Sequence, residues 1–97
     1  LLNLYRNGND RMGWHSDDEW EMGLDPVIAS ISLGSPRKMK FRHRFDPQVS
    51  KFALELSQGS LLIMAGTTQK FWQHEIPKTK KLVGERLNLT FRFIQSR

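Results

Sequence analysis

The stretch GWHSDDE at residues 13–19 sets a histidine beside three acidic side chains. In an extended chain, successive side chains point to opposite faces, so His15 and Asp17 share one face while Ser16 and Asp18 face away. An imidazole and a carboxylate on one face can fill two coordination positions of a metal ion. The spacing therefore predicts part of a metal site, which needs a third ligand from elsewhere in the chain.

The other two histidines, His43 and His74, are the candidates for that third ligand. His43 lies in RKMKFRHR, where dense positive charge disfavours a bound cation, so we prefer His74. Two histidines and one carboxylate leave positions open for a cosubstrate and dioxygen, as in non-haem Fe(II) oxygenases. Zinc accepts similar ligands, and these residue types do not exclude it.

The segment RLNLTFRF at residues 86–93 alternates strictly between polar and apolar side chains. Its polar face consists of Arg86, Asn88, Thr90 and Arg92. For one strand alone, the simplest interpretation is a sheet with one wet face and one dry face. Two guanidinium groups flanking an amide and a hydroxyl also form a clamp for a small dicarboxylate, because guanidinium binds carboxylate through paired hydrogen bonds. Asn3 and Tyr5 repeat the two-residue step, so we expect strands to converge on a polar pocket.

Short alternating runs separated by turn residues must position these side chains, and they predict an all-β domain of antiparallel strands. Eight strands are expected, at residues 2–5, 12–17, 27–33, 37–44, 52–56, 60–65, 71–76 and 86–94. Eight short strands suggest a sandwich, a jelly roll or a small barrel. We expect at most one short helical turn, at residues 18–24.

Composition limits the classes of protein that this chain can be. Its 97 residues contain no linker rich in Gly, Ser or Pro, so we expect one domain. A formal net charge of +5 favours anionic partners such as nucleic acid. The absence of cysteine excludes a disulfide scaffold and a thiolate metal site, and it is compatible with the reducing cytoplasm. No apolar stretch is long enough to span a bilayer, so we expect a cytoplasmic protein without a membrane partner.

Together these motifs resemble the AlkB-type Fe(II)- and 2-oxoglutarate-dependent nucleic-acid dealkylases, in particular their DNA-repair branch. The motifs of that branch read N-x-Y, H-x-D-x-E, a distal histidine and R-x-N-x-T-x-R, and all four occur in order between Asn3 and Phe93. The resemblance implies a double-stranded β-helix, which is a jelly roll, with residues 1–97 as its catalytic core. We expect the N-terminal nucleotide-recognition segment of the family to be missing.

The resemblance also implies the cofactors Fe(II) and 2-oxoglutarate and a role for each motif residue. His15, Asp17 and His74 would bind the iron. Arg86 would pair with the distal carboxylate of 2-oxoglutarate, and Arg92 with the carboxylate next to the metal. Further cosubstrate contacts would come from Asn3, Tyr5 and Asn88, with support from Thr90.

Contacts to the substrate are expected from two other places. Glu19 ends the H-x-D-x-E motif and would contact a flipped base, although a surface glutamate near a helix start is also commonplace. A basic ribbon consists of Lys38, Lys40, Arg42 and Arg44. Such a ribbon suits a phosphate backbone, and members of the family use a basic stretch here against DNA, so Arg42 and Arg44 are our candidate contacts. The alternative is an edge strand whose cations discourage aggregation.

The function implied by the resemblance is oxidative demethylation of N-alkylated bases, of the 1-methyladenine and 3-methylcytosine type, in DNA or RNA. The reaction would consume 2-oxoglutarate and O2 and release succinate, carbon dioxide and formaldehyde. One alternative is a 2-oxoglutarate-dependent hydroxylase of a protein or small molecule. The other is a non-catalytic nucleic-acid-binding β domain. Because the family covers the apolar face of the last strand with the missing segment, we expect an exposed apolar patch at Leu87, Leu89, Phe91 and Phe93.

Overall fold

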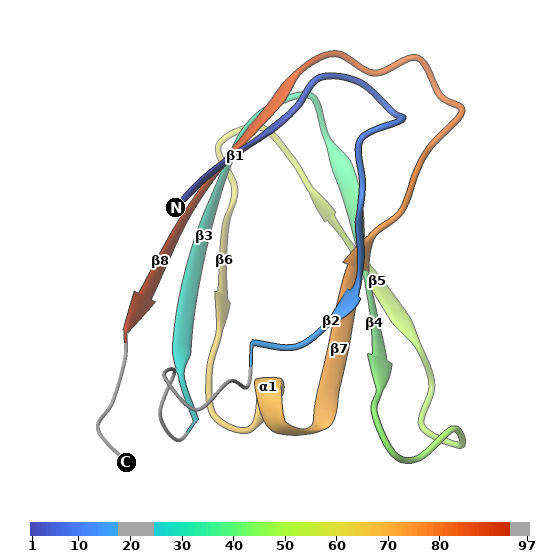
Figure 1. The fold of residues 1–97 in the computed structure, drawn as a ribbon, viewed down its shortest axis with the longest axis vertical. Helices are drawn as coiled ribbons and strands as arrows, with labels where there is room; N and C mark the ends of the chain where they lie inside the picture. The colour runs from blue at the N-terminus through green and yellow to red at the C-terminus, as the bar shows by residue number, and fades with distance from the viewer. Residues whose placement is uncertain (18–24, 94–97) are drawn as a thin grey trace.

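The computed structural model describes residues 1–17 and 25–93, which form two four-stranded antiparallel sheets packed face to face (Figure 1). The strands are β1 (Leu2–Tyr5), β2 (Met12–His15), β3 (Val27–Gly34), β4 (Arg37–His43), β5 (Phe52–Leu56), β6 (Leu61–Met64), β7 (Trp72–Ile76) and β8 (Arg86–Phe93). The first sheet has the order β1-β8-β3-β6, and the second has the order β2-β7-β4-β5. This arrangement is a jelly roll, so the predicted all-β fold is confirmed.

All eight predicted strands are present, with boundaries that differ by no more than two residues. Helix α1 (Thr68–Phe71) was not predicted, and Phe71 was expected in the strand that follows. A single helical turn is too short to show hydrophobic periodicity, so the sequence pattern there is ambiguous. The helical turn expected at residues 18–24, with Glu19, and the strand end expected at Ile94 lie outside the described residues.

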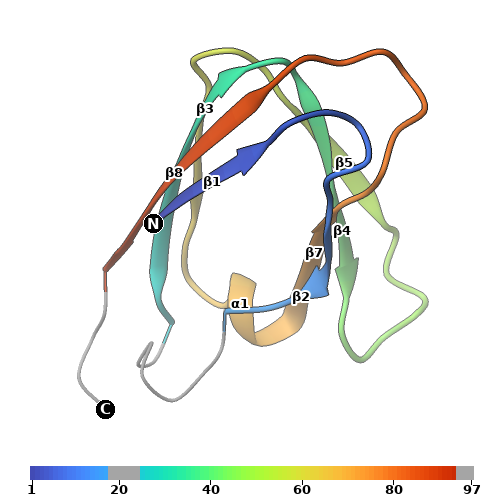
Figure 2. The same cartoon turned by 45° about the horizontal axis from the view of Figure 1, so that its top comes forward.

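Helix α1 lies at one end of the sandwich, in the connection that leads from β6 in the first sheet to β7 in the second (Figures 1 and 2). Gln69 is its one buried residue. A membrane-spanning helix needs about 20 apolar residues, and no helix in the described ranges meets that requirement.

Strand β8 is the centre of the first sheet's polar face, because it pairs with β1 on one side and β3 on the other. Asn88 lies opposite Asn3 and Ser32, while Arg86 lies opposite Tyr5 and Gly34. Gly34 has a φ of +98°, and a Cβ there would lie 2.3 Å from the carbonyl oxygen of Glu85. Only glycine tolerates this conformation and this close approach, so it allows β3 to pair fully with the start of β8.

The apolar core between the sheets consists of Tyr5, Ile28, Met39, Phe41, Leu56, Met64 and Ile76. Strand β8 reverses the usual pattern, because its polar side chains are the inward ones. Phe91 and Phe93, on the opposite face, are 53% and 62% exposed. An exposed apolar patch is therefore confirmed at these two residues, whereas Leu87 and Leu89 are half-buried. The polar face of this strand thus points inward, as expected for strands that converge on a polar pocket, and the simpler interpretation of a solvated polar face does not apply to it.

Candidate metal and cosubstrate site

His15, Asp17 and His74 meet at one point and line a cavity together with residues from both sheets. Their candidate ligand atoms all lie within 4.8 Å of one another. β2 and β7 pair so that His15 lies opposite His74, with ring centroids 4.2 Å apart. Two imidazoles and one carboxylate at this spacing can hold a metal ion on one side and leave its other positions open.

Both imidazoles have a ring nitrogen available to a metal. The Nδ1 of His15 lies 2.8 Å from the carbonyl oxygen of Gly13, so a proton on Nδ1 donates to that carbonyl and leaves Nε2 as an acceptor. His74 is 3% exposed, and its Nδ1 has no hydrogen-bond partner among the described residues. Burial, with a smaller effect from His15, lowers the pKa of His74 to about 4, against the opposing effect of Asp17. His74 is therefore neutral near pH 7, as a metal ligand must be.

Asp17 lies just beyond the last residue of β2, where the ladder to β7 has ended. Side chains hold the chain here instead. The hydroxyl of Ser16 donates to the carbonyl oxygen of Trp72 over 2.5 Å, and the backbone N–H of Asp17 donates to Oε1 of Gln69 over 2.8 Å. The carboxylate of Asp17 lies 3.8 Å from Nη2 of Arg92, so the end of β8 lies beside the three candidate metal ligands.

A hydrogen-bonded polar row covers the inner face of β8 and the neighbouring strand β3. Nη2 of Arg86 donates to the hydroxyl of Ser32 over 2.9 Å. The hydroxyl of Ser30 donates to Oδ1 of Asn88, whose Nδ2 donates to the hydroxyl of Thr90 over 2.8 Å. The polar side chains in the middle of this inner face thus hydrogen-bond to one another, and these bonds fix their rotamers.

Arg86 is the exception, because it is 1% exposed and pairs with no acidic side chain in the described part of the chain. Its Nε and Nη1 have no hydrogen-bond partner there either. The Tyr5 ring lies 4.9 Å from its Cζ, which partly compensates the charge. A buried cation without a counter-ion is costly, so the site is suited to an anionic ligand such as a carboxylate.

The two arginines of the polar row, Arg86 and Arg92, lie toward opposite ends of β8. Arg86 and Arg92 are six residues apart, so their Cα atoms are separated by about 20 Å along the strand. Arg86 reaches toward Ser32, which lies opposite Asn88, and so shortens this gap. Arg92 reaches Asp17 at the metal end. His15, Asp17 and His74 therefore fit Fe(II), and the donors of Arg86 and Arg92 fit carboxylate groups.

Comparison with known proteins agrees with this geometry. A family model described as the 2OG-Fe(II) oxygenase superfamily matches residues 1–92. The chain belongs to this superfamily. The name of the superfamily contains Fe(II) and 2-oxoglutarate, the two cofactors that were predicted from the sequence.

Curated relatives of this oxygenase chain carry the names of AlkB homologues. The chain is 44% identical over 101 residues to the human protein named alpha-ketoglutarate-dependent dioxygenase alkB homolog 3, a match that covers 97% of the chain and 35% of the relative. It is 41% identical over 100 residues to the Bos taurus protein named DNA oxidative demethylase ALKBH2, with 97% and 36% covered. The Arabidopsis thaliana protein with that same name is 36% identical over 115 residues, with 97% and 37% covered. The chain thus spans about a third of the length of these relatives.

Three polar residues of the candidate site were not predicted from the sequence. Ser30 and Ser32 alternate with Ala29 and Ile31, and the same two-residue step that identified the polar face of β8 could have identified them. Gln69 lies in the helix that was not predicted, and no pattern in the sequence indicated its contact with Asp17.

His43, the rejected candidate for the third ligand, lies outside the metal group. Its Nδ1 accepts hydrogen bonds from the backbone N–H groups of Phe45 and Asp46, at 3.2 and 3.0 Å. Its ring stacks on Phe71 and meets Trp72 edge to face. These contacts give His43 a role in holding the turn after β4.

The predicted basic ribbon on β4 divides into two parts. Nε and Nη2 of Arg42 donate to Oε1 of Gln73, and its guanidinium lies 4.3 Å from the centroid of the Trp14 ring. Nη1 of Arg44 donates to the carbonyl oxygens of Gln69 and Lys70 in α1. Both arginines are therefore half-buried and hold neighbouring segments, whereas Lys38 and Lys40 are exposed.

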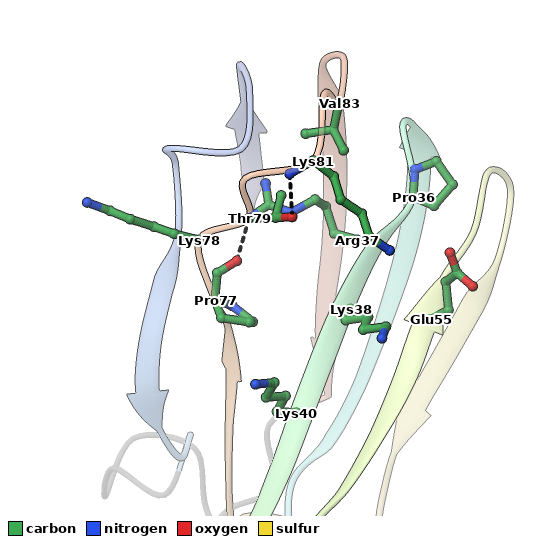
Figure 3. Close-up of a pocket in the computed structure, with 10 residues that line it drawn as sticks. All are labelled: Pro36, Arg37, Lys38, Lys40, Glu55, Pro77, Lys78, Thr79, Lys81 and Val83. Carbon is green, nitrogen blue, oxygen red and sulfur yellow. Dashed lines mark hydrogen bonds between the residues drawn. The ribbon is translucent and has the colours of Figure 1, made fainter.

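Lys38 and Lys40 border a concave surface that also includes Lys78 and Lys81 from the connection between β7 and β8 (Figure 3). We call these four lysines the basic surface. Beneath it, Arg37 is 5% exposed and donates to three backbone carbonyl oxygens, those of Asn7, Asp10 and Pro77. Arg37 thereby fixes the connection that carries two of the lysines. Glu55 lines the same concave surface as the four lysines.

Proposed function

We propose that this oxygenase chain, residues 1–97, is the catalytic core of an enzyme that oxidatively demethylates N-alkylated bases, of the 1-methyladenine and 3-methylcytosine type, in DNA or RNA. The observation that carries the proposal is the convergence of His15, Asp17 and His74, whose candidate ligand atoms lie within 4.8 Å of one another in a cavity that Arg92 also lines. It is supported by the buried Arg86 on the same strand as Arg92, because the Nε and Nη1 of Arg86 have no hydrogen-bond partner among the described residues. The names of the relatives, which include DNA oxidative demethylase, support nucleic acid as the substrate. The products would be succinate, carbon dioxide, formaldehyde and the repaired base.

In the proposed site, His15, Asp17 and His74 hold Fe(II). Iron with 2-oxoglutarate supplies the oxidising chemistry when bound, and the protein orients the reactants. A proton on Nδ1 of His15 donates to the carbonyl of Gly13, which would leave Nε2 of that ring to hold the metal. Burial keeps His74 unprotonated, which removes the competition between a proton and the metal for its ring.

The polar row of the first sheet binds 2-oxoglutarate in this proposal. Arg86 pairs with the distal carboxylate, which satisfies the N–H groups on its unpartnered Nε and Nη1. Arg92 pairs with the carboxylate next to the metal, and Asn3, Tyr5 and Asn88 donate hydrogen bonds along the ligand, with Thr90 supporting Asn88. Burial raises the pKa of Tyr5, although Arg86 opposes this, so its hydroxyl keeps the proton that it donates.

Apolar side chains complete the lining of the site and limit the access of water. They are Met12, Ile28, Met39, Met64 and Ile76, and they come from both sheets. A dry environment strengthens the pairing of Arg86 with a carboxylate, because charges interact more strongly at low dielectric. It also protects reactive species from side reactions with solvent.

Contacts to the nucleic acid are proposed on the basis of charge and position. The basic surface offers four lysines to backbone phosphates, and the net charge of +5 adds long-range attraction. We retain Arg42 and Arg44 as proposed contacts, since both arginines are half-buried and not enclosed. Glu19 remains a proposed contact to the flipped base. A cytoplasmic location remains a proposal, supported by the absence of cysteine.

The decisive experiment supplies the protein with Fe(II), ascorbate, 2-oxoglutarate and an oligonucleotide that carries one 1-methyladenine. We expect equal amounts of succinate and repaired base, and we expect His15→Ala to abolish both. An unmethylated oligonucleotide and a His43→Ala variant are the controls. Succinate without repair would contradict the proposed substrate and favour a hydroxylase of another molecule. Binding of the oligonucleotide without any succinate would favour a non-catalytic domain.

A further inference from the structure

Gln69 occupies an unusual position for a neutral polar side chain. It is 1% exposed, and it is the buried residue of a helix whose other residues are exposed or half-buried. Its Oε1 accepts the backbone N–H of Asp17 at 2.8 Å, and its Nε2 lies 3.6 Å from Sδ of Met64. Burying an amide is costly unless its hydrogen bonds are made, so both ends of this side chain fix its rotamer.

The contact between Gln69 and Asp17 spans 52 positions of the sequence. It replaces the missing ladder, because the pairing of β2 with β7 stops at His15. Five residues after Gln69, the same segment provides His74. One short piece of chain, α1 with the start of β7, therefore carries one candidate metal ligand and holds the backbone of another.

We propose that Gln69 is a positioning residue of the metal site, which fixes the backbone of Asp17 so that its carboxylate faces the two imidazoles. The inference rests on the proposed metal site and does not depend on the identity of the substrate. Groups that hydrogen-bond to metal ligands orient them, and their loss typically weakens metal binding about 10- to 100-fold. Gln69 bonds to the backbone of Asp17 and not to its carboxylate, so the loss of Gln69 should change the position of that carboxylate relative to the two imidazoles.

The test measures Co(II) binding by calorimetry and by the visible d–d absorption of the bound ion, which reports the geometry of its ligands. Gln69→Met keeps the length of the side chain and removes the amide oxygen. Gln69→Asn keeps the amide and shortens the reach by one methylene group, so it provides the same test if the first variant does not fold. Leu56→Ala, in the core on β5, is the matched control for reduced stability, since Leu56 is 4% exposed and belongs to neither site.

We expect both Gln69 variants to bind Co(II) about tenfold more weakly or worse, with an altered spectrum, while Leu56→Ala lowers the melting temperature and keeps the affinity and spectrum of the wild type. Wild-type affinity and spectrum in the Gln69 variants would overturn the inference, and so would an equally weakened affinity in Leu56→Ala. His15→Ala separates this failure from that of the proposed function. If His15→Ala leaves Co(II) binding unchanged, the proposed metal site itself is wrong. If His15→Ala loses Co(II) binding while the Gln69 variants bind Co(II) as the wild type does, only the inference about Gln69 is wrong.

Discussion

The two sheets of this jelly roll differ in their buried polar residues, although both contribute to the apolar core. The second sheet places apolar residues such as Met39, Phe41 and Ile76 inside and exposes Lys38 and Lys40. The first sheet buries a polar set consisting of Ser30, Ser32, Arg86, Asn88 and Thr90. Its outer face exposes an apolar set that includes Leu2, Leu4, Leu61, Ile63, Phe91 and Phe93.

This difference shows that the polar interior of the first sheet lies against the candidate metal ligands of the second, while both sheets contribute to the apolar core. Burial of apolar area stabilises the fold, and the second sheet contributes four of the seven core residues, from β4, β5 and β7. The first sheet uses its interior for hydrogen bonds and a buried cation, which are costly without a partner. The metal group lies on the second sheet, at the point where it faces the polar row of the first.

The largest expected effect is on stability, and it compares two phenylalanines of the two sheets. Phe41 is 3% exposed and stacks on Phe52 in the second sheet, whereas Phe91 is 53% exposed on the outside of the first. We expect Phe41→Ala to reduce the free energy of unfolding by about 3–5 kcal/mol, and Phe91→Ala by less than about 1 kcal/mol. Urea unfolding measures both, and equal reductions would contradict the assignment of the core to the inner face.

The next effect is a pH dependence that originates in the second sheet. The pKa of His74 is about 4 in the folded protein against an ordinary value of 6.5, so between these pH values the unfolded chain binds the proton and the folded chain does not. The metal-free protein should therefore lose stability as the pH falls from about 6.5 toward 4, by at most about 3 kcal/mol from this group.

Thermal unfolding in a chelator at several pH values measures this loss of stability. Because carboxylates also titrate at low pH, the relevant quantity is the difference from His74→Gln. That variant lacks the titrating ring and should show a flatter pH dependence. An identical dependence in both proteins would show that His74 is not held in a neutral, buried state.

A somewhat smaller effect is expected for cosubstrate binding by the first sheet. Arg86→Gln removes the buried cation, and a hydrogen bond to a charged group contributes about 1.5–3 kcal/mol, which corresponds to a roughly 10- to 100-fold weaker affinity for 2-oxoglutarate. Calorimetry with Mn(II)-loaded protein gives the dissociation constant. Arg6→Gln is the matched control, since Arg6 is exposed and pairs with Asp10. Unchanged affinity in Arg86→Gln would remove the first sheet from the ligand site.

The smallest expected effect concerns the outer face of the second sheet. Replacing Lys38 and Lys40 with Ala should reduce the slope of log affinity against log salt for an oligonucleotide by about one unit for each phosphate that the variant no longer neutralises. Fluorescence anisotropy at four or five salt concentrations measures the slope, with Lys51→Ala as the control outside the basic surface. The same measurement on Arg42→Ala and Arg44→Ala would show whether these internally bonded arginines also bind phosphates. An unchanged slope in the lysine variant would assign Lys38 and Lys40 to solubility alone.

Strand positions and the motif residues could be predicted from the sequence because both are local patterns. Alternation over four to eight residues identified all eight strands, and the spacing of two placed His15 with Asp17 and Arg86 with Asn88. Helix α1 and the role of Arg37 could not be predicted in this way. A single helical turn has no period, and Arg37 reads as the start of a basic strand, although it holds three loop carbonyls.

The sequence by itself determined which residues share a face, because the pleat of a strand alternates side chains without reference to the rest of the chain. It did not determine which face points inward. In β8 the polar face is buried, because the second sheet and its candidate metal ligands lie over that face. The apolar face of β8 is the more exposed one. Only the tertiary structure could decide this, and only it could join Gln69 to Asp17, since burial and contacts across 52 residues depend on how the sheets pack.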